Sequence, residues 1–388
     1  MTRSGLTKAF ALLLVLLVTA RAQLVLDDVV EPDDVQDPDA KQQEATNPLT
    51  RMLQWGVDNT DKDSLAERAR AIREGRSQPQ KVDREVMEAM FGTKISMLQE
   101  SVKNLNSANE ANEEETLIDA LESLEYHCSD IDNANDLDAV GGLSTVLDLM
   151  SHSSNAVRTA ALWVIGTMAQ SNPKGQEMLM SKGVLSSIFT PLKAVIEAGT
   201  AKEADPKLIA KALYATSTLV RGCAACLQSF ESQQGSSVIA NLLFIVNKST
   251  EQLQWLAVKR KLTALISDLI VEDSNLQVSA RLAKSFASSS SSSQASVVRD
   301  VVSFLETDDR ELHEKSIDTL SALLQAVPPS VEAMNGARLP QLLQLSIANA
   351  QKKMASAQEG DESWEEVSLA GESLLSMLRN SSATKTES

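Results

Sequence analysis

Apolar residues recur at helical spacing along this 388-residue chain, and this pattern limits the folds open to it. In residues 157–168, apolar side chains fall at i, i+3, i+4 and i+7, which places them on one face of a helix. Residues 262–269 and 317–324 repeat this spacing, and no stretch alternates apolar and polar residues for long enough to indicate a sheet. Aromatic residues make up only 3% of the chain, which suits helices packed through small and aliphatic side chains. The sequence therefore predicts an all-α fold.

The expected helices also recur along the chain. Gly142 opens one apolar helix, and Gly183 opens the next one 41 positions later. Residues 211–214 mirror residues 160–163, and a fainter third unit lies around 258–270. Intervals of about 40–47 residues are typical of armadillo-type repeats, in which each unit buries its apolar face against its neighbours. We therefore expect an armadillo-like right-handed α-solenoid with an extended groove and a flexible N-terminal segment.

The first 22 residues have the pattern of a secretory signal peptide. Arg3 and Lys8 supply positive charge, residues 10–18 are apolar without a break, and residues 20–22 place Ala at the two positions that signal peptidase reads. An uncleaved anchor is the alternative, although the apolar run is shorter than the roughly 20 residues that span a bilayer. No other segment is comparably apolar and long, so we expect the cleaved chain to be soluble, with no membrane contact.

Composition divides the chain into segments. The stretch after the signal peptide is acidic and contains Pro, and it cannot bury enough apolar surface to fold alone. It carries two short amphipathic runs, 49–57 and 86–91, which we expect to form short helices on a tether. The four expected segments are a signal peptide (1–22), a disordered acidic leader with short helices (23–93), an armadillo-like helical repeat domain (94–345), and a C-terminal helix with a flexible tail (346–388).

The charge and the motif content argue against two broad functions. A net charge of −17 would repel the phosphate backbone, so nucleic-acid binding is not expected. The three His residues have no metal-ligand spacing with Cys, Asp or Glu, so neither a metal site nor a cofactor is expected. The chain has no nucleophile-elbow, Walker or dinucleotide-binding motif. We therefore expect no enzymatic activity, and a function carried by a surface that binds another macromolecule.

Three cysteines and two sequons bear on the compartment. Cys223 and Cys226 have redox spacing, yet with Cys128 they also fit small buried apolar residues, and both interpretations stay open. Asn247 and Asn380 begin N-glycosylation sequons, which are used only if the chain is translocated. Sequons arise often by chance, so the two sequons add little to the evidence that the signal peptide gives for a secretory-pathway location.

Several motifs resemble a known family. Residues 130–137 (D-I-D-N-A-N-D-L) look like the D-N-A-N-D-L segment of the armadillo-type exchange factors of 70-kDa heat-shock chaperones. Residues 158–172 are similar to that family's A-A-x-x-I-G-T-x-x-Q-N helix, and residues 211–221 to its K-A-L-(Y/F)-A helix. Residues 52–59 (M-L-Q-W-G-V-D-N) resemble its opening L-L-x-W helix. The resemblance covers residues 47–275, and the middle motifs are specific only in combination.

The resemblance implies a function and a partner. It implies a nucleotide exchange factor whose concave surface clamps lobe II of the nucleotide-binding domain and promotes ADP release. The signal peptide favours the family's endoplasmic reticulum branch, which serves the lumenal chaperone BiP, and we expect a monomer. The resemblance and helix geometry together indicate these partner-binding residues: Ala134, Asn135, Arg158, Trp163, Thr167, Tyr214, Arg221, Lys259 and Arg260.

Other interpretations compete with this one. An armadillo scaffold could bind another secretory-pathway protein, although peptide-binding solenoids use repeated Trp and Asn ladders, and this chain offers Trp163 once, with Thr167 where a ladder Asn would lie. A redox cofactor would use Cys223 and Cys226. A cytoplasmic location follows if the apolar start is not a signal peptide.

Overall fold

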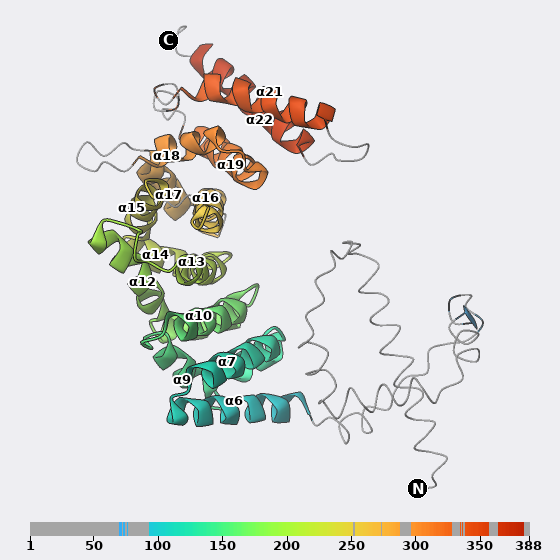
Figure 1. The fold of residues 1–388 in the computed structure, drawn as a ribbon, viewed down its shortest axis with the longest axis vertical. Helices are drawn as coiled ribbons and strands as arrows, with labels where there is room; N and C mark the ends of the chain where they lie inside the picture. Colours follow the sequence, from blue (N-terminus) through green and yellow to red (C-terminus); the bar gives the residue numbers. More distant parts are fainter. Residues whose placement is uncertain are drawn as a thin grey trace. The chain divides into compact units, whose positions relative to one another are not determined.

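The structure is a computed structural model of the chain (Figure 1). The chain divides at Thr93 into two units, and the second, Lys94–Ser388, contains every helix described below. The predicted signal peptide, most of the acidic leader and the 52–59 motif lie outside the described residues. The structure describes residues 93–250, 253–272, 274–287, 296–327, 338–356 and 364–383, together with the isolated positions 70, 71, 73, 76, 334 and 336.

The described part of Lys94–Ser388 consists of helices joined by turns and short loops, with no strand, which confirms the predicted all-α solenoid. One set of helices stacks side by side, each packing against the next, and we call it the main row (Figure 1). The main row consists of α7 (Glu114–Cys128), α10 (Asn155–Ala169), α13 (Pro206–Val220), α16 (Leu256–Val271) and α19 (Arg310–Ala326).

A second row runs alongside the main row (Figure 1). It consists of α9 (Gly142–Leu149), α12 (Val184–Ala198), α15 (Gly235–Asn247) and α18 (Val297–Ser303), which is followed by the 3-10 helix η1 (Phe304–Glu306). Further helices link the rows, namely α8 (Ile131–Asp136), α11 (Pro173–Ser181), α14 (Ala224–Ser232) and α17 (Leu276–Ala287). The stack begins with α6 (Lys94–Ala111) and ends with α21 (Leu339–Ser356) and α22 (Glu365–Ala383).

The sequence determines where α10 begins and which face it buries. The Ser154 hydroxyl accepts hydrogen bonds from the first-turn amides of Ala156 and Val157, which would otherwise lack partners. The apolar face predicted at 157–168 is buried between neighbouring helices. Asp205 and Asp309 cap α13 and α19 in the same way, so each of these main-row helices begins at a side-chain cap.

A left-handed residue precedes three helices of the second row. Gly141 (φ 81°) precedes α9, Gly183 (φ 69°) precedes α12, and Gln234 (φ 59°) precedes α15. Glycine adopts this conformation without steric cost, whereas Gln has a Cβ that makes it unfavourable. The third repeat is faint in the sequence partly because Gln234 replaces the glycine that marks the first two.

The C-terminal end differs from the sequence-based division. The boundary expected at residue 346 falls inside α21, and a second helix, α22, packs against both α21 and α19. Buried contacts join these helices to the repeats. His313 of α19 contacts Ser346 of α21 (Nδ1–Oγ 3.0 Å), and its ring meets that of Trp364 edge to face at 5.9 Å. The helical stack therefore continues through residue 383.

No single helix within the described ranges has the length and apolar character needed to cross a bilayer. One sharply bent pair, Pro173–Ser181 with Val184–Ala198, meets those two criteria when its members are taken together.

The buried His313 makes stability depend on pH. Its side chain is 2% exposed, and burial lowers the pKa of its imidazole below the usual 6.5. Its Nε2 donates to the Thr307 carbonyl oxygen at 2.7 Å, which raises the pKa, but burial is the larger cause. Protonation is therefore easier in the unfolded chain, and the free energy of unfolding should fall as the pH drops below about 6.5, by at most about 1.4 kcal/mol per pH unit.

Urea unfolding of the full chain at pH 7.5, 6.5 and 5.5 measures this dependence. We expect His313→Gln to have a shallower slope than the wild type across this range, whatever its absolute stability. Equal slopes in the wild type and His313→Gln would rule out His313 as the source.

Candidate functional site

The exposed face of the main row carries a group of aromatic and lysine side chains. The Lys211 Nζ of α13 lies 3.6 Å from the centroid of the Trp163 ring of α10 and 5.4 Å from that of Tyr214. The Lys261 Nζ of α16 lies 5.8 Å from the centroid of the Tyr214 ring. Such contacts are attractive because the ring face is electron-rich. We call Trp163, Lys211, Tyr214 and Lys261 the aromatic–lysine cluster.

Hydrogen bonds fix the cluster to α7 and α10. The Tyr214 hydroxyl donates to Gln170 Oε1 at 2.8 Å and lies 3.5 Å from the Thr167 hydroxyl. Thr167 donates in turn to Glu125 Oε1 of α7, at 2.7 Å. Four consecutive helices of the main row therefore contribute to one continuous polar and aromatic surface.

The cluster is positively charged, with Glu125 at its edge. Burial lowers the pKa of Lys211, the nearby charge of Lys261 lowers it further, and Glu125 opposes both effects. Lys211 is partly buried and Lys261 is exposed, and their two ammonium groups repel each other. A carboxylate supplied by a partner would relieve this repulsion, so the surface suits an acidic binding partner.

Gly166 allows Tyr214 to lie against α10. A Cβ built on Gly166 would lie 2.3 Å from Cε1 of the Tyr214 ring, far inside van der Waals contact. The absence of a side chain at Gly166 therefore sets the depth at which the ring packs.

Of the predicted partner-binding residues, the structure brings three together. Trp163, Thr167 and Tyr214 belong to this one surface, together with Lys211 and Lys261, which the sequence reasoning missed. Lys211 precedes Tyr214 by three positions, and residues at this spacing lie on the same face of a helix. The position of Tyr214 could therefore have identified Lys211.

The prediction that Lys259 contacts a partner is wrong, because the residue is buried. Its side chain is 2% exposed and its Nζ lies 5.6 Å from the centroid of the buried Phe304 ring. Lys261, two positions later, is exposed on the main-row face. The register of the faint third repeat was therefore wrong, because each residue turns a helix by about 100°.

Arg158 also lies elsewhere than predicted. Five positions separate it from Trp163, which rotates it by about 140° around the helix axis. The structure places Arg158 in a pocket of about 230 Å³ with Pro191 of α12 and Ile209 of α13, where its Nη1 donates to Asn155 Oδ1 at 3.2 Å. Arg158 therefore faces the second row, and not the cluster.

The predicted Ala134 contact is contradicted by burial. Ala134 is 1% exposed, and Asn133 beside it donates to the His127 carbonyl oxygen at 3.0 Å. These residues hold α8 in place. Asn135 keeps a buried Oδ1 that has no hydrogen-bond partner within the described part of the chain.

Two predicted arginines join neighbouring helices of the main row. Arg221, at the end of α13, pairs with Asp268 of α16. Arg260 of α16 pairs with Asp309 (Nε–Oδ1 2.9 Å) and with Glu311 (Nη1–Oε2 2.9 Å), both at the start of α19. Both are at least partly exposed, so they contribute to the main-row surface while bridging its helices.

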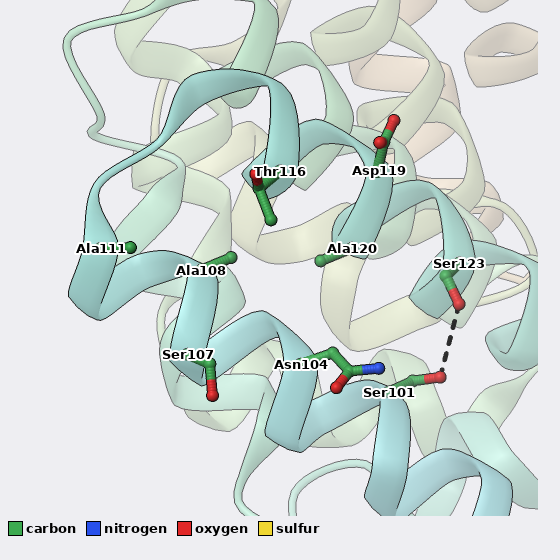
Figure 2. A pocket seen from close by; sticks show the side chains of 9 residues that line it. All are labelled: Ser101, Asn104, Ser107, Ala108, Ala111, Thr116, Asp119, Ala120 and Ser123. Carbon is green, nitrogen blue, oxygen red and sulfur yellow. Dashed lines mark hydrogen bonds between the residues drawn. The ribbon is translucent and has the colours of Figure 1, made fainter.

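The sequence analysis did not identify two surface features, an exposed tyrosine and a pocket. The tyrosine is Tyr126, at the end of α7 next to Glu125, which is 74% exposed. A pocket of about 460 Å³ lies between α6 and α7, and its lining consists of small and polar side chains, with Ser101 and Ser123 in contact at 3.4 Å (Figure 2). In the ranges that the structure describes, no three His, Cys, Asp or Glu side chains gather as metal ligands would.

The two sequons lie in different surroundings. Asn247 Nδ2 donates to Asp300 Oδ1 at 3.0 Å and to Ser303 Oγ at 3.1 Å. Asp300 is buried, with a raised pKa caused by burial. Asn380, by contrast, is exposed on α22.

Two family models match consecutive parts of the chain. The model described as nucleotide exchange factor Fes1 matches residues 49–137, and that described as SIL1/FES1/HPBP1 C-terminal domain matches residues 133–299. Together they cover more than half of the 388 residues. The chain is therefore similar to the SIL1/FES1/HPBP1 family from residue 49 to residue 299.

Individual members of the SIL1/FES1/HPBP1 family show the same similarity. The Hsp70 nucleotide exchange factor FES1 of Mycosarcoma maydis is 27% identical over 234 residues, which are 58% of this chain and 55% of that protein. The nucleotide exchange factor SIL1 of Xenopus laevis is 27% identical over 180 residues, 46% of this chain and 36% of that protein. The chain thus matches about half or less of these relatives' lengths.

Solved structures support the fold alone. A designed armadillo repeat protein superposes with a TM-score of 0.51 and 18% identity, covering 72% of this chain and 99% of its own. An engineered protein gives a TM-score of 0.53 at 13% identity, covering 73% and 98%. The match to the C-terminal family model, residues 133–299, spans α9 to α17 and therefore contains the whole aromatic–lysine cluster.

The contact between Gly166 and Tyr214 predicts an unusual substitution effect. Ala normally stabilises a helix by about 1 kcal/mol relative to Gly. Here we expect Gly166→Ala to destabilise the fold by about 1–3 kcal/mol, because the new methyl group overlaps the Tyr214 ring. Urea unfolding of the full chain measures the difference.

A double-mutant cycle separates the two causes. In a Tyr214→Ala background the ring is absent, so Gly166→Ala should become neutral or stabilising. If the substitution had the same effect in both backgrounds, the ring contact would not be what Gly166 accommodates.

Proposed function

We propose that this chain is a nucleotide exchange factor for a 70-kDa heat-shock chaperone, and that it acts without catalysing a covalent reaction. The observation that carries the proposal is the aromatic–lysine cluster on the main row, inside the region matched by the family. The relatives named as Hsp70 nucleotide exchange factors support the same function. The chain would then act by binding its partner through the aromatic–lysine cluster, without a catalytic site.

The cluster suits a protein surface that presents carboxylates. Lys211 and Lys261 supply the positive charge, and Trp163 and Tyr214 supply rigid aromatic area beside it. Aromatic side chains backed by charge are common among residues that dominate binding energy. We place the contact with lobe II of the chaperone's nucleotide-binding domain on this cluster, with Thr167 and Arg221 at its edges.

Exchange follows from a preference between two states of the chaperone. If the main-row surface fits the lobe better when it is rotated away from ADP, binding favours that rotation and weakens the hold on ADP. The coupling is reciprocal, so bound ADP weakens the exchange factor by the same factor. A tenfold faster release requires about 1.4 kcal/mol off the release barrier.

The ion pairs between helices support such a clamp. Arg221 with Asp268, and Arg260 with Asp309 and Glu311, join α13 to α16 and α16 to α19. A surface that is already ordered loses less conformational freedom on binding, and more of the contact energy is available to act on the partner. We propose that the chain works as a monomer, because one copy supplies the whole cluster.

The compartment we propose is the lumen of the endoplasmic reticulum, with a BiP-type chaperone as the partner. The support is the charged and apolar pattern of residues 1–22, with its small residues at 20 and 22. A cytoplasmic location is the alternative, and the two are distinguished by the second experiment below.

Release of fluorescent ADP from the lumenal 70-kDa chaperone tests the exchange activity. After a chase with excess unlabelled nucleotide, we expect the full chain to accelerate release at least tenfold. Lys211→Glu/Lys261→Glu should lose most of this acceleration, because both ammonium groups of the cluster become carboxylates.

The matched control is Lys193→Glu/Lys284→Glu, which makes the same charge change at exposed positions on α12 and α17. It should accelerate release as the wild type does. Equal loss in both variants would move the contact away from the cluster. No acceleration by a folded wild-type chain would leave an armadillo scaffold for a different partner.

Glycosylation reports whether the chain enters the lumen. In secretory cells we expect a glycosidase-sensitive shift that Asn380→Gln abolishes, since Asn380 is exposed. Ser249→Ala removes the other sequon while keeping the Asn247 amide, and it should leave the shift unchanged. A glycan on Asn247 would take one of the two N–H donors that bond Asp300 and Ser303. Absence of any shift in the wild type would favour the cytoplasmic alternative.

A further inference from the structure

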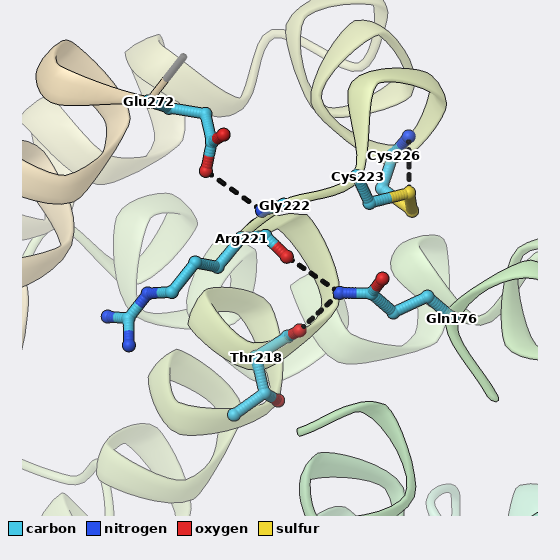
Figure 3. Close-up of a disulfide and its surroundings, with 7 residues drawn as sticks. All are labelled: Gln176, Thr218, Arg221, Gly222, Cys223, Cys226 and Glu272. Atoms are coloured by element: carbon cyan, nitrogen blue, oxygen red, sulfur yellow. Dashed lines mark hydrogen bonds between the residues drawn. A yellow bond between two sulfur atoms is a disulfide. The ribbon is translucent and has the colours of Figure 1, made fainter. Parts of the chain in front are cut away.

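A disulfide joins Cys223 and Cys226 at the turn between α13 and α14 (Figure 3). Cys223 is the N-cap of α14, and its Sγ accepts a hydrogen bond from the Cys226 amide at 3.2 Å. Cys223 is partly exposed, whereas Cys226 is fully buried. Of the two cysteines, therefore, only Cys223 keeps surface that solvent can reach, and Cys226 is protected.

This bond contributes little to holding the fold together. Its cysteines are three positions apart, and a cross-link that closes so short a loop restricts the unfolded chain least. The turn also has other attachments (Figure 3). Gln176 Nε2 donates to the carbonyl oxygens of Thr218 (2.9 Å) and Arg221 (2.8 Å), and the Gly222 amide donates to Glu272 at 2.9 Å.

The helix start favours the reduced form of Cys223 as a thiolate. The first-turn amides of α14 carry partial positive charge, and one of them already points at the sulfur. Thiolates are stabilised in this position, and the Cys-x-x-Cys spacing keeps a second sulfur within reach. A bond that is locally placed, partly exposed and not needed for packing belongs to the labile class of disulfides.

We propose that Cys223 and Cys226 form a reversible redox site that exchanges with glutathione-class thiols, with Cys223 as the sulfur attacked first. This activity is independent of nucleotide exchange, and it survives if the proposed function fails. It is assigned from the position of the pair on α14 and the attachments of the turn.

The exchange takes place in two steps. A glutathione thiolate attacks Cys223 Sγ, a new S–S bond forms to Cys223, and the Cys223–Cys226 bond breaks. Its electron pair leaves on Cys226, which takes a proton from water. A second thiolate then attacks the glutathione sulfur, releasing oxidised glutathione and the Cys223 thiolate. Two glutathione molecules are oxidised and one protein disulfide is reduced. The reverse sequence restores the bond.

Cys128 does not take part in this chemistry. It is 2% exposed, and burial raises the pKa of its thiol to about 12, so it stays protonated and shielded. Any thiol gained on mild reduction of the folded chain is therefore assigned to the pair.

The test equilibrates the full chain in buffers of different ratios of reduced to oxidised glutathione. After an acid quench, free thiols are alkylated and located by peptide mass mapping. We expect Cys223 and Cys226 to pass together, and reversibly, between disulfide and dithiol while the circular dichroism stays helical. Reduction only together with loss of helical signal would overturn the proposal, since the bond would then be structural.

Two single variants test which sulfur is attacked. In Cys226→Ser, oxidised glutathione should form a mixed disulfide at Cys223 at least tenfold faster than it does at Cys226 in Cys223→Ser. Equal rates, or a faster reaction at Cys226, would contradict the assignment. If either variant fails to fold, the wild-type titration still decides whether the pair is reversible.

Discussion

The structure depends on apolar burial between successive helices of the main row. Helix α10, for example, packs against α7 on one side and α13 on the other, and its residues Val157, Val164 and Met168 are completely buried. Each inner helix of the main row packs against a main-row neighbour on either side and against the second row. Only one narrow face of the helix is then left to solvent. That face is where Trp163 and Thr167 lie, so the packing decides which residues a partner can reach.

The sequence predicted the helices well and the surface only in part. Helix faces are local, since a buried stripe recurs every three or four residues whatever the rest of the chain does. Exposure on one surface requires the rotation of each helix to be known, and an error of two positions exchanged Lys261 for Lys259. The spacing from Tyr214 indicates the helix face of Lys211, but its contact with Trp163 and its proximity to Lys261 join positions about fifty residues apart, which no local pattern reveals.

The 130–137 motif shows that a pattern typical of a family can serve packing within the protein and not contact with a partner. Asp130 caps α8 by accepting from the Asp132 amide at 3.0 Å, and it also pairs with Lys94 of α6. Asn133 bonds the end of α7, and Ala134 is buried. The motif thus positions a short helix between α6, α7 and α10. A pattern required for packing is as specific to a family as one required for binding, which is why similarity alone placed Ala134 at the interface.

Charge acts on two length scales in this chain. The net charge of −17 would slow the approach of an acidic partner from a distance. At physiological salt that repulsion is screened beyond about 8 Å, so the charges next to the contact decide its orientation. On the main-row face those charges are Lys211 and Lys261, which lie within 6 Å of the Tyr214 ring centroid. An acidic chain can therefore bind an acidic surface, provided that the surface meets the chain at the aromatic–lysine cluster.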